Sequence, residues 1–335
     1  MDAARVSLSQ LFLISDMVII ARIEAVTERS FSLDNKPTVY AVVSARVSSQ
    51  YKGSALKAVE FFQDAHGHAH YEPGDMAVVF LDELSAEHQL ADVGSAAGVS
   101  FVSSQVRNTE HRIAPGELAD YEWVLASYAE PTTGMIYPAA ERSLRIKETL
   151  LRMLGSNSTN ITESALLDWE NIGSGIQLNK EELGYLLALT RDPARPVNLR
   201  LAILRSMSRQ QLVDNTAWIY LFEHETDENL LPVVRSTQGN ENKVFMPYLT
   251  RLLDNPHDEV VEGAARAMAH PAYSGAESEI ERLLKRKSQR LNYAAVYALV
   301  GINSEQARKI LLDAEANHPN PKVRRMISAR MNVLS

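Results

Sequence analysis

Five segments in the second half of the chain resemble one another at a spacing of 30 to 33 residues. Each begins with an apolar residue and carries small or branched residues four or five positions later. Such self-similarity is typical of a stack in which each helix pair buries its apolar face against its neighbours. The segments are Val197-Asn198-Leu199-Arg200, Leu230-Leu231-Pro232-Val233, Val260-Val261-Glu262-Gly263, Leu291-Asn292-Tyr293-Ala294 and Val323-Arg324-Arg325-Met326.

A second helix is predicted before each segment, because leucine recurs there at Leu187, Leu221, Leu249, Leu283 and Leu311. Turns with proline, such as Asp192-Pro193, lie between the two helices of several pairs, and proline is tolerated in the first turn of a helix. This pattern resembles short HEAT repeats of the phycobilisome-lyase-like type. The resemblance implies an α-solenoid of about five helix pairs over residues 179–335, which offers a surface for binding. Arginine commonly follows the leading apolar residue in HEAT helices, and in this alignment only Val323-Arg324 keeps it.

In the first half of the chain, the sequence predicts β structure over residues 15–105. Val39, Ala41, Val43, Ala45 and Val47 alternate with the residues between them, as in a half-buried strand. Four further short strands are separated by turn-forming residues, which predicts a small closed or nearly closed barrel over residues 1–105.

This stretch resembles the OB-like barrels of the netrin and metalloproteinase-inhibitor type found in exported bacterial proteins. The matching residues are Asp16 to Ile23, Tyr40 to Gly53, and Gly74-Asp75 with Val78 to Leu81. Animal inhibitors of this type chelate the protease metal through an N-terminal cysteine, and this chain has no cysteine. The resemblance therefore implies a fold and an export route, and does not carry that mechanism over.

The expected architecture is an α+β multidomain chain, with a small N-terminal OB-like β-barrel followed by an all-α HEAT-type solenoid. Residues 106–178 are predicted to form a linker with helices and a degenerate first repeat.

The expected location is periplasmic or secreted, with the cytoplasm as the alternative. The start Met1-Asp2-Ala3-Ala4 lacks the basic and apolar regions of a signal peptide, which favours a mature N-terminus that follows a removed signal. The longest apolar run, residues 17–21, is far shorter than the roughly 20 residues that span a bilayer. We therefore expect no membrane-spanning segment.

Three alternating histidines give one candidate site. In an extended segment His66, His68 and His70 project to the same side, where imidazoles can bind zinc, and Glu72 can complete the site. This supports an alternative hypothesis of metal carriage or of metalloenzyme inhibition. The simpler interpretation is a solvated polar loop, with no cofactor.

The C-terminal end gives the second candidate site. The net charge of the chain is −8, yet residues 282–335 hold 11 Lys and Arg against 3 Asp and Glu. Such a patch can meet an anionic partner, and nucleic acid is the weaker alternative because the earlier repeats are acidic. The candidate residues are Arg282, Lys285, Arg286, Lys287, Arg290, Lys322, Arg324 and Arg325.

No catalytic residue is assigned, because the sequence contains no nucleophile elbow, metalloprotease motif or phosphate-binding loop. The leading hypothesis is a non-enzymatic scaffold whose solenoid binds another protein, with the barrel as a second interaction module.

Overall fold

The computed structural model describes residues 6–33, 36–63, 71–88, 90–103, 110–132, 139–172, 176–238 and 242–334. The chain divides into two compact units, Met1–Glu182 and Leu183–Ser335. No helix in the described part of the chain is both long and apolar enough to cross a bilayer.

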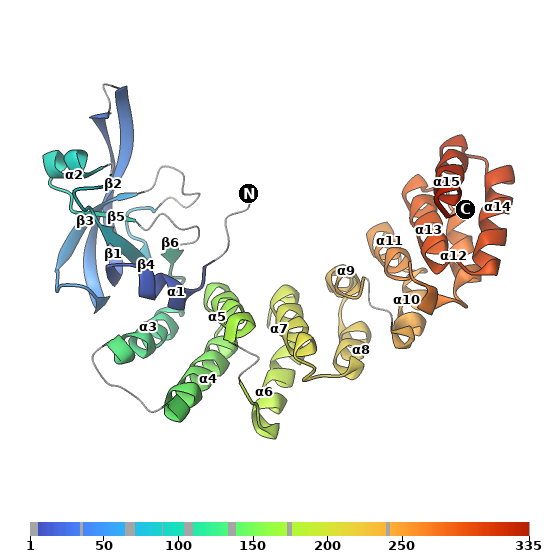
Figure 1. The fold of residues 1–335 in the computed structure, drawn as a ribbon, viewed down its shortest axis with the longest axis horizontal. Helices are drawn as coiled ribbons and strands as arrows, with labels where there is room; N and C mark the ends of the chain where they lie inside the picture. The colour runs from blue at the N-terminus through green and yellow to red at the C-terminus, as the bar shows by residue number, and fades with distance from the viewer. Residues whose placement is uncertain are drawn as a thin grey trace. The chain divides into compact units, whose positions relative to one another are not determined.

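The first unit is built around a closed five-stranded barrel (Figure 1, blue to teal). The strands follow one another around the barrel in the order β1, β2, β3, β5, β4, and β4 pairs again with β1 to close it. β3 and β5 are parallel, and the other pairs are antiparallel. The predicted OB-like barrel is thereby confirmed, and a sixth strand pairs with residues 77–79 of β4. The strands are β1 Met17–Leu33, β2 Lys36–Lys52, β3 Ala58–Gln63, β4 Met76–Glu83, β5 Phe101–Ser103 and β6 Glu110–Arg112.

Both faces of β2 contribute to packing. Val43 and Ala45 lie in the barrel interior with Phe61, as the alternation predicts. Val42, on the opposite face, packs with Phe62 under the short helix α2 (Ala91–Ala97). The barrel is therefore covered on one outer side, while Val39 remains half-exposed near the end of the strand.

A short helix before the first strand, α1 (Leu8–Ile14), joins the barrel to the helices that follow it. Lys52 of β2 donates from Nζ to the carbonyl oxygens of Phe12 at 3.0 Å and Leu13 at 2.9 Å. These bonds satisfy carbonyls at the open C-terminal end of the helix. This helix is not among the elements predicted from the sequence.

The other side of α1 packs on a helical layer of the first unit. The backbone N–H of Leu8 donates to Ser164 Oγ at 2.7 Å, and Ser9 Oγ donates to Asp168 Oδ1 at 2.8 Å. α4 packs against α5 within the first compact unit, in the region where the sequence predicts a degenerate first repeat. The helices of this layer are α3 Leu118–Thr132, α4 Ala139–Gly155 and α5 Thr159–Ile172.

The second unit contains five helix pairs in the described residues, as the repeat period predicted. We name the first helix of each pair an A helix and the second a B helix. The B helices pack in series, with α11 between α9 and α13, and the A helices form a second layer. Short 3-10 turns, η2 (Lys243–Phe245) and η3 (Pro271–Tyr273), precede two of the A helices. The A helices are α6 Lys180–Arg191, α8 Asn215–His224, α10 Met246–Leu252, α12 Glu277–Leu284 and α14 Glu305–Asn317. The B helices are α7 Val197–Arg209, α9 Asp227–Ser236, α11 Asp258–Ala267, α13 Gln289–Ile302 and α15 Pro321–Leu334.

Burial fixes the register of the B helices. In four of them a buried apolar pair is followed at once by an exposed residue, and these exposed residues are 30, 31 and 31 positions apart. The equivalent leading residues are then Leu199, Asn229, Val260, Leu291 and Val323. The sequence alignment was therefore wrong by two residues in the first pair and by one residue in the second. The buried pairs with their exposed successors are Ile203-Leu204-Arg205, Val233-Val234-Arg235, Ala264-Ala265-Arg266 and Ala295-Val296-Tyr297.

Side chains also close the C-terminal ends of the A helices. Arg251 donates to the carbonyl oxygen of Phe222 at 3.0 Å, and Arg286 donates to that of Leu253 at 2.8 Å. His318 lies 2.9 Å from the Leu284 carbonyl through Nε2. Its Nδ1 accepts from the backbone of Asn320, which places the imidazole proton on Nε2. The three acceptors lie at the ends of α8, α10 and α12, so each of these A helices is capped by the pair that follows it.

Close packing of α13 on the end of α11 requires glycine at Gly301. A Cβ atom there would lie 2.5 Å from the carbonyl carbon and oxygen of Ala269. By contrast, a Cβ at Gly184 of α6 would meet nothing within 4 Å. The two glycines therefore allow a matched comparison within one solenoid.

We expect Gly301→Ala to destabilise the solenoid by about 1–3 kcal/mol, because the backbone of α11 must move. Gly184→Ala should instead stabilise it by about 1 kcal/mol, the difference in helix propensity. Urea denaturation followed by circular dichroism measures both changes. Equal effects of the two substitutions would show that the close approach of Gly301 to the Ala269 backbone does not affect stability.

The first unit contains one buried carboxyl with a shifted pKa. Burial raises the pKa of Asp168 above its usual 3.8, although hydrogen bonds from Ser7 and Ser9 act in the opposite direction. The folded chain therefore binds this proton more tightly than the unfolded chain does. The resulting stability is present below pH 3.8 and is lost as the pH rises through the raised value.

Asp168→Asn should remove that pH dependence, because the amide stays neutral at every pH. We expect its thermal stability to fall less than that of the unchanged protein between about pH 4 and pH 7. Glu148→Gln, at an exposed position on α4, is the control and should leave the decline unchanged. If the thermal stability of Asp168→Asn still falls over this pH range, Asp168 is not the group that causes the decline.

Candidate protein-interaction surface

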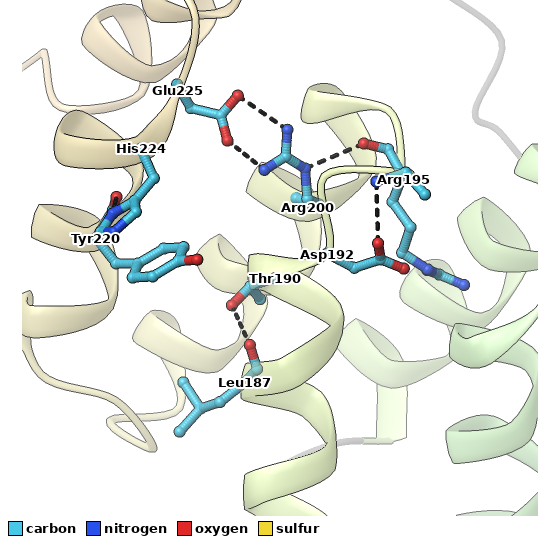
Figure 2. A network of polar contacts seen from close by, with 9 residues as sticks. Leu187, Thr190, Asp192, Arg195, Arg200, Tyr220, His224 and Glu225 are labelled. Atoms are coloured by element: carbon cyan, nitrogen blue, oxygen red, sulfur yellow. Dashed lines mark hydrogen bonds and ion pairs between the residues drawn. The ribbon is translucent and has the colours of Figure 1, made fainter.

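The most completely buried ion pair of the second unit joins its first two helix pairs (Figure 2). The Arg200 and Glu225 side chains are 2% and 7% exposed. Arg200 binds both carboxylate oxygens of Glu225 and donates from Nε to the Arg195 carbonyl at 3.1 Å. A planar guanidinium suits this two-point contact. The pair fixes the turn before α7 against the end of α8, so its role is structural.

Aromatic and charged side chains surround this ion pair (Figure 2). Tyr220 and His224 stack at a centroid distance of 4.0 Å, and the Arg191 guanidinium lies 4.9 Å from the Tyr220 ring. Burial lowers the pKa of Arg195, which nearby Tyr185 and Asp192 partly oppose. These groups are engaged with one another, and the arrangement holds two helix pairs together.

Arg200 occupies the position after the leading residue Leu199, where HEAT helices commonly carry arginine. The expectation that only Val323-Arg324 keeps this arginine was therefore wrong, because the first pair was misaligned. Asn292 holds the same position in α13 and donates to the carbonyls of Leu283 at 2.8 Å and Arg286 at 3.0 Å. Arg324 donates to the His318 carbonyl at 2.6 Å. In three pairs this position binds the backbone of the preceding turn.

Removing the Arg200 guanidinium should leave Glu225 buried without its counter-charge. We expect Arg200→Ala to destabilise the solenoid by about 3–5 kcal/mol. Arg205→Ala, one turn further along α7 at an exposed position, should change stability by no more than about 0.5 kcal/mol. Chemical denaturation distinguishes the two, and similar losses in both variants would contradict the structural role.

The predicted zinc site cannot be placed, because His66, His68 and His70 lie outside the described residues. Glu72 is exposed in a turn where its backbone N–H donates to Asp75 Oδ2 at 2.8 Å. Elsewhere, the described residues contain no cluster of three metal-binding side chains. Zinc binding by this loop stays a prediction.

Much of the predicted basic patch is paired with carboxylates. Arg282 and Arg286 lie 2.8 and 3.5 Å from Asp254, and Lys285 lies 2.8 Å from Glu281. These pairs reduce the positive charge that α12 offers to an anionic partner.

The remaining basic candidates lie on α13 and α15 and around a nearby pocket. Arg290 pairs with Glu259 and Glu262 of the preceding B helix. Arg325 donates to the Pro321 carbonyl at 3.4 Å. Lys287 is exposed and, with Lys285 and Arg286, lines a pocket of about 630 Å³ between α12 and α14, whereas Lys322 is exposed at the start of α15.

The corrected register identifies a set of exposed residues at equivalent positions that are not among the sites predicted from the sequence. Arg205, Arg235, Arg266 and Tyr297 occupy the same exposed position on α7, α9, α11 and α13, and we call them the arginine row. Arg205 donates to Ser236 Oγ on the next B helix at 2.7 Å. The Arg266 guanidinium lies 5.4 Å from the Tyr297 ring, again on the next B helix. Arg266 and Tyr297 therefore lie side by side, and Arg205 reaches the residue that follows Arg235.

Comparison with known proteins supports the fold. A family model described as HEAT repeats matches residues 246–330, which extend from α10 into α15. The chain thus consists of a closed N-terminal barrel followed by a helical repeat solenoid, and the last part of the solenoid matches HEAT repeats. No curated protein matches this chain.

Three solved structures show a weaker likeness. One is a designed armadillo repeat protein in complex with the peptide (KR)4, at 18% identity and a TM-score of 0.39 over 57% of this chain and 99% of that chain. A second designed armadillo repeat protein has 19% identity and a TM-score of 0.38 over 57% and 100%. An engineered protein has 17% identity and a TM-score of 0.36 over 56% and 95%.

Proposed function

We propose that this chain is a non-enzymatic scaffold whose B-helix layer binds another protein, with the barrel as a second interaction module. The observation that carries the proposal is the arginine row, which repeats one exposed position across four consecutive B helices. A rigid layer with regularly spaced side chains suits recognition of another chain, since little order is lost on binding.

The A-helix layer is a less suitable binding face. Its acidic side chains are partly engaged in holding the pairs together, as Glu277 shows. Glu277 is buried and accepts hydrogen bonds from Ser304 Oγ at 2.6 Å and from the Gly275 backbone at 2.7 Å. Burial opposes ionisation, but these hydrogen bonds prevail and lower the pKa of Glu277. The carboxylate of Glu277 thus links α12 to the N-terminus of α14 through Ser304.

The proposal includes a periplasmic or secreted location, with the cytoplasm as the alternative. Its support is the resemblance of the barrel to those of exported bacterial proteins. Fractionation of the source cells with an antibody against the chain tests the location. Recovery only with cytoplasmic markers would contradict it.

Site-specific cross-linking tests the proposed binding face. A photoreactive benzoylphenylalanine in place of Tyr297 should give one saturable adduct in the native extract, and excess unlabelled chain should compete with it. The same group in place of Leu312, which is 56% exposed on α14, is the control and should give little adduct. Equal labelling from both positions, or none from Tyr297, would count against binding through the B-helix layer.

A further inference from the structure

The arginine row has unused hydrogen-bonding capacity. Within the described residues the Arg235 side chain forms no hydrogen bond or ion pair, and the Arg205 side chain binds only the neutral hydroxyl of Ser236. Arg266 uses Nε to bind Glu262 at 2.8 Å, while its two terminal amino groups make no such contact there. A guanidinium carries five N–H donors in a fork that matches a carboxylate. Each arginine of the row can therefore donate hydrogen bonds to an anionic group of a ligand.

Apart from Glu262, which binds Arg266, the acidic side chains of the B helices lie away from this row. Asp227, Glu228, Asp258 and Glu259 occupy the first turns of α9 and α11, where they complement the helix dipole. Seven residues separate Glu228 from Arg235 and Glu259 from Arg266, which corresponds to about 10 Å along a helix. The row is thus a narrow basic stripe bordered by an acidic one. A single extended strand fits it better than a broad polyanion does.

The spacing of the row sets the spacing of its ligand. Packed helices lie about 8–10 Å apart, and a chain in the extended polyproline II conformation advances about 3.1 Å per residue with three residues per turn. Every third residue of such a chain therefore projects to the same side and meets the next member of the row as the chain crosses the B helices. Since α7, α9 and α11 supply arginine and α13 supplies Tyr297, three carboxylates and then an apolar residue would face them in turn.

We propose that the arginine row binds an extended segment of the partner protein that has acidic side chains three residues apart. This inference rests on the proposed function and narrows it to a class of partner segment. Arg266 and Tyr297 already form a cation–π contact, so the end of the row can hold an aromatic or aliphatic side chain beside the last carboxylate.

Fluorescence anisotropy with synthetic peptides tests the spacing on the full chain. The probe is a fluorescein-labelled peptide of about twelve residues, mostly serine, with three Glu residues placed three apart and a Leu three residues further on. The matched control has the same composition with the Glu residues adjacent. We expect the spaced peptide to bind about tenfold more tightly, the difference expected for one charge-assisted hydrogen bond. Raising the salt concentration should weaken its binding.

Two variants locate the binding. Arg205→Gln, Arg235→Gln and Arg266→Gln combined should weaken binding of the spaced peptide by at least about tenfold. Lys285→Gln, Lys287→Gln and Lys322→Gln combined remove the same charge at the C-terminal end and should leave binding unchanged. Circular dichroism verifies that both variants fold, since all six positions are exposed.

Several results would overturn the inference. These are equal affinity for the two peptides, no binding at low salt, or loss of binding only in the lysine variant. Binding of fluorescein-labelled oligothymidylate as tightly as the spaced peptide, with loss in the arginine variant, would reassign the row to nucleic acid. If the peptides fail while cross-linking from Tyr297 still succeeds, the acidic segment is wrong and the scaffold function stands.

Discussion

The solenoid depends on how the C-terminal ends of its A helices are satisfied. A helix leaves its last carbonyls without partners inside the helix, and burying them unpaired costs free energy. In α8, α10 and α12 the missing donor comes from the following pair, through Arg251, Arg286 and His318. Each pair thus completes the one before it, which couples neighbours beyond the burial of apolar surface.

The same coupling fixes the B-helix layer and hence the surface. Because α7, α9, α11 and α13 share one register, their exposed positions align into a row although they are 30 or 31 residues apart in sequence. The buried Arg200–Glu225 pair anchors the first of these helices. The arrangement of the candidate site is therefore a product of the repeat itself, and no loop has to position it.

The sequence allowed the barrel, the helix pairs and their period to be predicted, because alternating and helical apolar patterns are strong where one face is buried. It did not allow the register of α7 to be predicted. Leu199, Leu201, Ile203 and Leu204 are all buried, so apolarity does not mark one face, and Arg200 has the appearance of a surface residue. The arginine row was missed for this reason.

The short helix α1 was missed for a different reason. Its signal was present in the capping box formed by Ser7 and Gln10, but a helix of seven residues gives too little periodicity to stand out. The histidine loop remains a matter of sequence alone, since its three histidines lie outside the described residues.

The close approach at Gly301 has an evolutionary consequence. Arrays of similar repeats commonly grow by internal duplication, which requires that one unit can stand beside any other. Here α13 fits against the end of α11 only because a glycine meets the backbone of Ala269. A pair moved into this place would bring a side chain into that contact unless it also carried glycine there, which restricts the pairs that can follow α11.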